Sequence, residues 1–369
     1  MFTLGEHYKH FLKGFVQVTL IMKPNNYHSY NLHQLAKACQ LCVQGRKSVL
    51  YLTGLCPRDC YYCPLSDTRK NKDVIFINER KIRNINQIIE EIKLSKSKGV
   101  GITGGDPLLK LKRTITAIKL LKKEFGKAFH IHLYTSLNLV TKASLSKLSK
   151  AGLDELRLHP DLDNKSLWPK IKLAKNYPWK LGIELPCIPG YYKNTVELIN
   201  LAHNHISFLN INELEISDTN TCKLSEHGFK TKDKISYAIK GSHQQALKLL
   251  AYIKINHPHL PVHYCTAKLK DSIQLKNRLI LRAKSIKQPY ELVSADGMLL
   301  KGIIFAGKKT AEKLKQEYQI PKNLISYDKP NNQILIAPWI LLKIRKKLSH
   351  PSVIRAEYPT HDRLLVEEN

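Results

Sequence analysis

The stretch "LCPRDCYYCP", Leu55–Pro64, holds three cysteines within eight residues, Cys56, Cys60 and Cys63, in a C-x3-C-x2-C pattern. The residues that lead into it, "SVLYLTGLC" (48–56), are mostly apolar or β-branched and predict a buried strand. In α/β sheets and barrels, active-site loops gather at the carboxyl ends of the strands. We therefore expect the three cysteines to line an active site at the end of this first strand.

Strand and helix patterns alternate after this point. One helix pattern has Ile85, Ile88, Ile89 and Ile92 on one face and stops before Gly99. Such an alternation is typical of βαβ units, which build a parallel sheet. Six units predict an α/β fold of the partial (β/α)6 barrel type, with an open doubly wound sheet as the structural alternative. The predicted strands are 48–56, 100–103, 129–136, 153–159, 180–187 and 208–217.

We expect three parts in the chain. Residues 1–47 form an N-terminal extension with a C-x2-C pair, residues 48–265 form the barrel, and residues 266–369 form a smaller α+β module. In that module, two apolar runs flank Asp296 and Gly297, which is a strong hairpin signal. The N-terminus lacks the layout of a signal peptide, and no apolar run is long enough to span a bilayer. These features predict a cytoplasmic protein with no membrane partner.

The chain is strongly basic, with 60 Lys and Arg against 30 Asp and Glu and a net charge of +30. An excess of this size favours polyanionic partners such as nucleic acid. The alternative is a lysine-rich but merely solvated surface. The basic residues are spread along the chain instead of forming a separate arm, so composition leaves both interpretations open.

The chemistry of the cysteine stretch narrows the choice of metal. Thiolates are soft ligands that suit zinc or iron–sulfur clusters. A tetrahedral zinc site needs a fourth ligand, and none follows nearby at the usual spacing. A [4Fe–4S] cluster usually takes four thiolates, so three would leave one iron without a protein ligand and open to another molecule.

This pattern, with Tyr62 before the last cysteine, resembles the radical S-adenosylmethionine superfamily. The resemblance implies a [4Fe–4S] cluster whose free iron holds S-adenosylmethionine, which is cleaved to methionine and a 5′-deoxyadenosyl radical that abstracts a substrate hydrogen. The stretches "TGLCPRDCYYCPLSDTRKNKDV", "ITGGDP", "FHIHLYTS", "AGLDELRLHP" and "NINELEIS" also resemble an archaeal family described as related to pyruvate formate-lyase activating enzymes. This resemblance covers most of residues 39–285 and says little about the substrate.

The resemblance also implies a set of cofactor-binding residues. A Gly-Gly-Glu segment at the end of the second strand binds the amino group of S-adenosylmethionine in the superfamily. This chain has Asp in place of Glu, so the contact would be shorter or made by the backbone alone, and a plain strand-to-helix turn is the alternative. Polar residues after the third strand contact the ribose and carboxylate, although Ser or Thr there would equally suit a helix N-cap. Backbone after the fifth strand meets the adenine, as an aromatic side chain in the cysteine stretch would. The candidates are Gly104, Gly105, Asp106, Thr135, Ser136, Ile188 and Tyr62.

Polar residues at the ends of the later strands are candidates for a substrate pocket. We expect Glu213 and Glu215 to share one face of the sixth strand, because side chains alternate along a strand, and to form an inward polar face with two asparagines. An outward, solvated pair is the alternative, and a lone histidine is more often structural. The pocket candidates are His159, Glu184, Glu213 and Glu215.

A second group of cysteines has the spacing of half a tetrahedral zinc site. Cys39 and Cys42 form the C-x2-C pair, and Cys265 would complete it with His263 or Cys222. An auxiliary iron–sulfur cluster would use similar ligands, and buried free thiols are the alternative.

We therefore expect a radical S-adenosylmethionine enzyme with an unassigned substrate, RNA being one candidate. A second hypothesis is an activase-like protein that acts on a protein glycine. A third, from a different class, is a non-catalytic RNA-binding protein stapled by zinc. An enzyme of the expected type would need an electron donor such as ferredoxin or flavodoxin.

Overall fold

The computed structural model describes residues 22–217 and 219–369, so residues 1–21 of the predicted N-terminal extension, where a signal peptide would lie, fall outside the described residues. The chain divides into two compact units. The first comprises the chain up to Val43 together with Lys47–Ile89 and Lys98–Gln274. The second comprises Gln44–Arg46, Glu90–Ser97 and Leu275–Asn369. Each unit has a sheet of its own.

The sheet of the first unit has ten strands in the described residues, and seven neighbouring strands are parallel. The edge strands, β1 and β4, do not pair with each other in this part of the chain, so the barrel is open. The predicted α/β partial barrel is thus confirmed, and "VHYC" adds a seventh parallel strand to the predicted six. In sheet order the strands are β1 Tyr30–Leu32, β10 Val262–Cys265, β9 Phe208–Glu213, β8 Lys180–Cys187, β7 Glu155–His159, β6 His130–Ser136, β5 Gly99–Thr103, β2 Lys47–Tyr51, β3 Phe76–Ile77 and β4 Arg80–Lys81.

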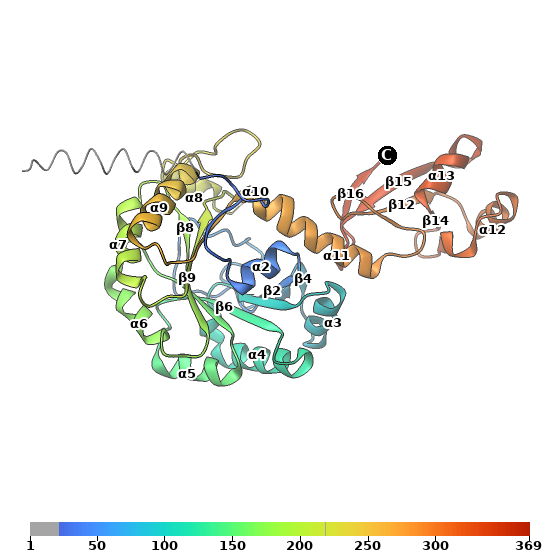
Figure 1. Ribbon diagram of the computed structural model, residues 1–369. Helices are drawn as coiled ribbons and strands as arrows, with labels where there is room; N and C mark the ends of the chain where they lie inside the picture. The colour runs from blue at the N-terminus through green and yellow to red at the C-terminus, as the bar shows by residue number, and fades with distance from the viewer. Residues whose placement is uncertain (1–21, 218) are drawn as a thin grey trace, which may run out of the picture. The chain divides into compact units, whose positions relative to one another are not determined.

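Helices surround this sheet (Figure 1). Their apolar faces pack on it, as the 3.6-residue periodicity predicts. For example, α5 is held at its start by a capping box of Thr141 and Ser144 and ends before Gly152. The helices of this unit are α2 Lys37–Val43, α4 Leu111–Phe125, α5 Lys142–Ala151, α6 Ile171–Ala174, α7 Tyr192–Ala202, α8 Thr221–Glu226, α9 Ser242–Asn256 and α10 Ala267–Leu269, with the 3-10 helices η1 Pro107–Lys110 and η2 Lys165–Lys170 and the π-helix η3 Lys270–Leu275. The helix α3 Asn86–Leu94 begins in this unit and ends in the second, and α11 Lys276–Ile286 belongs to the second unit.

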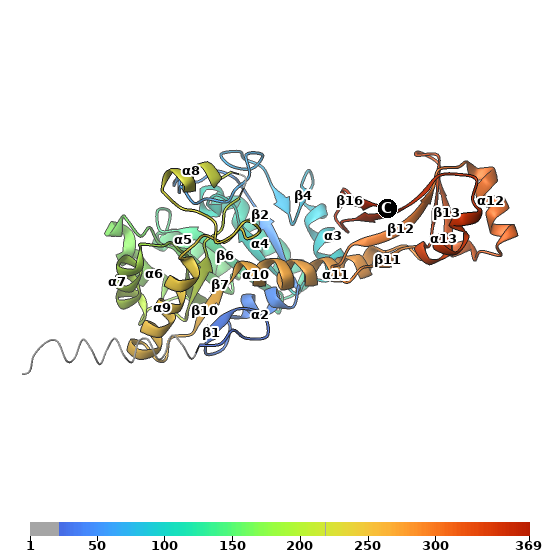
Figure 2. The same ribbon diagram turned by 90° about the horizontal axis from the view of Figure 1, so that it is seen from above.

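The short helix α2 covers the amino ends of the parallel strands. Its Ala38 amide donates to the carboxylate of Glu155, the first residue of β7, and Leu41 packs beside Gly99, the first residue of β5. Figures 1 and 2 show α2 across one end of the barrel, with α8 at the other end. The helix therefore forms a floor beneath the barrel interior, opposite the cysteine loop.

The second unit has an antiparallel six-stranded sheet with the path β13-β14-β12-β15-β16, and β11 also pairs with β12. The predicted hairpin around Asp296 and Gly297 is the β11–β12 pair. Buried residues of α12 and α13 share one core with β12, β13 and β14. The elements are β11 Leu292–Val293, β12 Leu299–Ile304, α12 Lys308–Glu317, η4 Lys322–Leu324, β13 Ile325–Asp328, β14 Gln333–Ile336, α13 Pro338–Ile344, η5 Arg345–Lys347, β15 Ser352–Glu357 and β16 Leu365–Glu368.

Among the described residues, no helix combines the length and the apolar character that crossing a membrane requires.

The loops after β2 and β5 meet through main-chain atoms. The Gly105 amide donates to the Thr53 carbonyl at 2.7 Å, and the Asp106 amide donates to the Leu55 carbonyl at 2.8 Å. A Cβ atom on Gly104 or Gly105 would lie 2.3 Å from the Thr53 or Leu55 carbonyl oxygen, respectively. Backbone cannot yield as a flexible side chain can, so glycine is required at both positions for the cysteine loop to keep its path.

We expect Gly105→Ala to lower the free energy of unfolding by about 1–3 kcal/mol, because its methyl group would overlap the Leu55 carbonyl. The matched control is Gly307→Ala, where a Cβ would have its nearest neighbour at 3.7 Å. Thermal unfolding of both variants measures the difference. An equal unfolding midpoint for the two variants would show that the loops can separate at little cost.

Candidate active site

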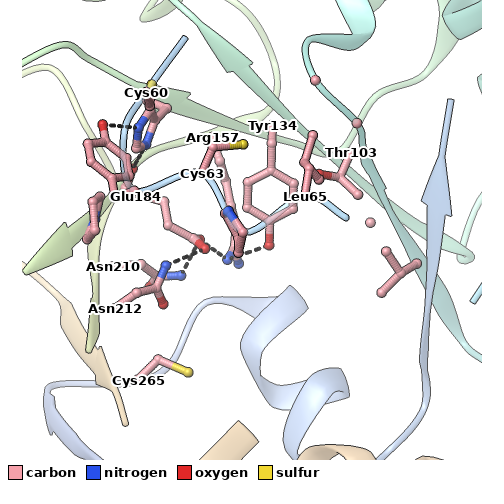
Figure 3. A pocket seen from close by; sticks show the side chains of 18 of the residues that line it. Cys60, Cys63, Leu65, Thr103, Tyr134, Arg157, Glu184, Asn210, Asn212 and Cys265 are labelled. Atoms are coloured by element: carbon pink, nitrogen blue, oxygen red, sulfur yellow. Dashed lines mark hydrogen bonds and ion pairs between the residues drawn. The ribbon is translucent and has the colours of Figure 1, made fainter. Parts of the chain in front are cut away.

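A cavity of about 780 Å³ lies inside the barrel unit. Its wall includes side chains from each of the seven parallel strands, together with the cysteine loop and helix α2 (Figure 3). Most of the residues predicted from the sequence line this one cavity, and Asp106 and Ile188 do not. Those that do are Cys39, Cys42, Cys56, Cys60, Tyr62, Cys63, Gly104, Gly105, Thr135, Ser136, His159, Glu184, Glu213, Glu215 and Cys265.

Arg58, inside the cysteine motif, ties the loop to the end of β7. Its guanidinium donates to the His159 carbonyl at 3.1 Å and forms an ion pair with Asp161 at 3.0 Å. The sequence interpretation overlooked this residue, although a cation among metal-binding cysteines was a visible signal. These contacts hold the loop over the open end of the barrel.

Tyr62 and His159 form a second tie between the same two segments. His159 Nδ1 lies 2.9 Å from the Glu184 carbonyl, which can only accept, so Nδ1 carries the proton. His159 Nε2 then accepts from the Tyr62 hydroxyl at 3.1 Å. Burial, with the nearby Arg58 charge, lowers the pKa of His159 to about 4. The imidazole is therefore neutral near pH 7, as this hydrogen-bond chain requires.

The three motif thiols have the donor chemistry of an iron–sulfur site. Burial raises the pKa of Cys56 to about 11 and raises the pKa of Cys60 as well, so ligation would have to displace protons. No three or more His, Cys, Asp or Glu side chains converge on a single ion in the described residues. Three separate thiols facing one cavity suit a cluster that offers each of them its own iron.

The Asp106 carboxylate is engaged by donors from its own chain. Its carboxylate is fully buried and accepts from Thr135 Oγ1 at 2.8 Å, Ser136 Oγ at 2.6 Å, the Ser136 amide at 3.0 Å and the Leu108 amide at 3.0 Å. These donors occupy the carboxylate, so the contact by backbone alone is the version of the cofactor prediction that fits this geometry, and it stays a prediction. Burial still raises the pKa of Asp106. Asp106 therefore positions Thr135 and Ser136, which do line the cavity.

The structure contradicts one alternative about this rim and leaves a prediction about Ile188 untested. Thr135 and Ser136 do not cap the following helix, because α5 begins at Lys142 and is capped by Thr141. Ile188 is 2% exposed, and its carbonyl accepts from Gln245 Nε2. Its carbonyl oxygen keeps a second lone pair, so a backbone contact between Ile188 and the adenine stays a prediction.

A polar network crosses the deeper part of the cavity (Figure 3). Arg157 Nη1 donates to Glu184 Oε2 at 2.6 Å, and its Nε donates to Glu155 at 2.6 Å. Asn210 and Asn212 donate to the two Glu184 oxygens at 3.0 and 2.9 Å. Burial alone would raise the pKa of Glu184, but the Arg157 charge and the amide donors lower it to about 2. A permanent ion pair therefore stands below the cysteine loop.

Glu213 and Glu215 do not form one polar face with these asparagines. Asn210 and Asn212 alternate with Ile211 and turn toward Glu184, whereas β9 ends at Glu213. Glu213 accepts from the Ala267 amide at 2.9 Å, and Glu215 pairs with Lys270. The two carboxylates line the cavity but are each engaged by other parts of the chain.

The second cysteine group lies on the floor of the same cavity. Cys39 Sγ accepts from Arg157 Nη2 and Asn210 Nδ2, each at 3.3 Å. Although burial raises the pKa of Cys39, Arg157 and His263 lower it to about 6. Cys42, Cys265 and His263 also line the cavity. With no converging ligand set in the described residues, a metal at Cys39, Cys42 and Cys265 gains no geometric support and stays a prediction.

Comparisons with known proteins agree with this geometry. The family model "Radical SAM superfamily" matches residues 50–211, and the model "Domain of unknown function (DUF8061)" matches residues 297–369. A curated protein of Methanocaldococcus jannaschii, named "Putative glycyl-radical enzyme activating enzyme MJ0021", is 42% identical over 92% of this chain and 94% of its own length.

Other similarities are weaker. A biotin synthase from Saccharophagus degradans is 30% identical over 28% of each chain. The crystal structure of methylornithine synthase matches 68% of this chain and 78% of its own with 14% identity and a TM-score of 0.41, which is too low to support an argument. On the strength of the family model and the relative that matches nearly its whole length, the chain belongs to the radical S-adenosylmethionine superfamily.

Proposed function

We propose that this radical S-adenosylmethionine enzyme holds its [4Fe–4S] cluster through Cys56, Cys60 and Cys63. The observation that carries the proposal is that these thiols line the same cavity as Gly104, Gly105, Thr135 and Ser136. Donors for a cluster and small or polar groups for a cofactor thus meet at the carboxyl ends of β2, β5 and β6, where ligands of parallel sheets bind.

When bound, the cluster and S-adenosylmethionine supply the radical that removes a hydrogen atom from the substrate. The protein holds the groups that would bind the cluster and the cofactor in fixed positions. The ties from Arg58 and Tyr62 to the end of β7 hold the cysteine loop, and Asp106 fixes Thr135 and Ser136. The barrel wall and the floor helix α2 limit the access of water to the deep part of the cavity.

The substrate would bind in the deeper part of the cavity. The wall there is polar, with Arg157, Glu184, Asn210 and Asn212 held to one another. A network whose members already satisfy one another stays rigid and presents a fixed pattern of donors and acceptors. This arrangement favours a polar substrate group and does not identify the molecule.

Activation of a glycyl-radical enzyme is the second candidate function, and it rests on the name of the M. jannaschii relative. The substrate would then be a glycine in a protein segment that enters the cavity from the cysteine-loop side. In either case the cluster needs an external one-electron donor, such as ferredoxin or flavodoxin. A radical signal on an added protein partner would favour activation, whereas a modified small molecule would favour the first candidate.

The cluster assignment predicts that Cys60→Ala, after anaerobic reconstitution with iron and sulfide, loses the cluster absorption and the cleavage of S-adenosylmethionine to 5′-deoxyadenosine. Cys222→Ala is the matched control, because Cys222 is an exposed thiol away from the cavity. Iron content, absorption spectra and product analysis measure the outcome. Retention of cluster and cleavage in Cys60→Ala would refute the assignment.

The Tyr62–His159 tie predicts a pH dependence. The folded-state pKa of His159, about 4, lies below the ordinary value of 6.5. The unfolded chain therefore binds more protons between these values, and stability falls as the pH drops from 6.5 to 4. The thermal unfolding midpoint should fall less over this pH window in His159→Gln than in the parent protein, since an amide can keep both hydrogen bonds without titrating. Parallel curves for the two proteins would contradict the assigned protonation state.

A further inference from the structure

The C-terminal module carries a basic and aromatic surface at one end of its sheet. Phe305 follows β12, and its amide donates to the Pro351 carbonyl at 3.0 Å. Arg345 Nη2 donates to the carbonyl of Ser352 at 2.9 Å, and Ser352 pairs with Ile304. Arg345 therefore lies near the end of β12 where Phe305 follows, and Lys346 and Lys347 come directly after it in η5. We call the six residues Phe305, Lys308, Lys309, Arg345, Lys346 and Lys347 the Phe305 surface.

The charges of the Phe305 surface are not neutralised. In the described residues, no ion pair joins Lys308, Lys309, Lys346 or Lys347 to a carboxylate, and Arg345 bonds only to a carbonyl. Glu312, the first acidic residue of α12, is already paired with Lys315 at 2.9 Å. The Glu312 charge also acts on Lys308. The five cations of this surface are nevertheless exposed and form no ion pair in the described residues, an arrangement that favours an anionic partner.

Apolar surface accompanies these charges. Phe305 is 44% exposed, although it directly follows the fully buried Ile304. On α13, Trp339 and Leu342 lie one turn apart and are 37% and 59% exposed. Leu341 and Ile344 of the same helix enter the core, so Trp339 and Leu342 occupy its outer face. Large exposed rings beside unpaired cations are a recognised combination for stacking bases along a phosphate backbone.

We propose that the Phe305 surface binds single-stranded RNA, with the phosphates on the lysines and Arg345 and an unpaired base stacked on Phe305. A duplex hides the base faces that an aromatic ring would cover, whereas loops and ends of RNA expose them. The α13 helix has seven residues, too short to insert an extended apolar face into a lipid surface. This inference concerns the C-terminal module and does not depend on the proposed cluster assignment.

Fluorescence anisotropy of the full chain with a labelled oligouridylate of about 15 nucleotides tests the proposal. We expect binding that weakens steeply as salt rises. The triple variant Arg345→Ala, Lys346→Ala, Lys347→Ala should lower the slope of log affinity against log salt by about 2, because each lost phosphate contact removes about 0.7. Phe305→Leu should weaken binding about tenfold through lost stacking, and Phe305→Tyr should restore it.

Two controls make the test specific. Lys147→Ala with Lys150→Ala removes two exposed charges from α5 and should leave the affinity nearly unchanged. Cys60→Ala should bind RNA as the parent chain does, which separates this inference from the cluster proposal. The proposal is overturned if double-stranded RNA or phosphatidylserine vesicles bind better than the oligouridylate. It is also overturned if Phe305→Leu, folded by thermal unfolding, binds as tightly as the parent.

Discussion

The contact between the cysteine loop and the Gly104–Gly105 turn consists of main-chain atoms on both sides. Each hydrogen bond in it joins backbone to backbone, and there is no room for even one methyl group between the two loops. The loop that would bind the cofactor therefore fixes the position of the cysteine loop relative to the barrel. Such a junction is stiff, because neither partner has a side chain that could rotate away.

Positions farther from this junction are set by buried polar groups. Asp106 collects four donors from the η1 and β6 segments, and Glu184 collects donors from β7 and β9. A buried carboxylate is costly unless all its oxygens are satisfied, and a satisfied one holds its donors in a single arrangement. The cavity thus has two carboxylate-centred supports, one at the rim and one within the barrel, and only the deeper one faces the cavity itself.

Sequence patterns predicted much of this arrangement, because they depend on local chemistry. The C-x3-C-x2-C spacing and the glycine pair indicated the class of enzyme, and strand periodicity predicted the barrel. The comparisons confirm the class, and with it the enzyme instead of the non-catalytic zinc alternative. Contacts between distant segments were not predictable in the same way. Arg157 was visible as a charge within a buried strand, but its partners depend on the register of β7, β8 and β9. The donors to Asp106 were not predictable either, because three of the four come from β6, a strand that starts 24 residues later.

The contacts of Arg58 and Tyr62 with His159 and Asp161 determine whether the cysteine stretch could function in another protein. The cysteine loop is not a self-contained metal-binding module, since two of its own side chains are anchored to the end of a strand about a hundred residues away. If the ten residues were moved to another scaffold without "LHPD", the three cysteines would still be present. The loop that carries them would no longer be held in its orientation. The two segments therefore depend on each other, and a substitution in one must preserve its contacts with the other.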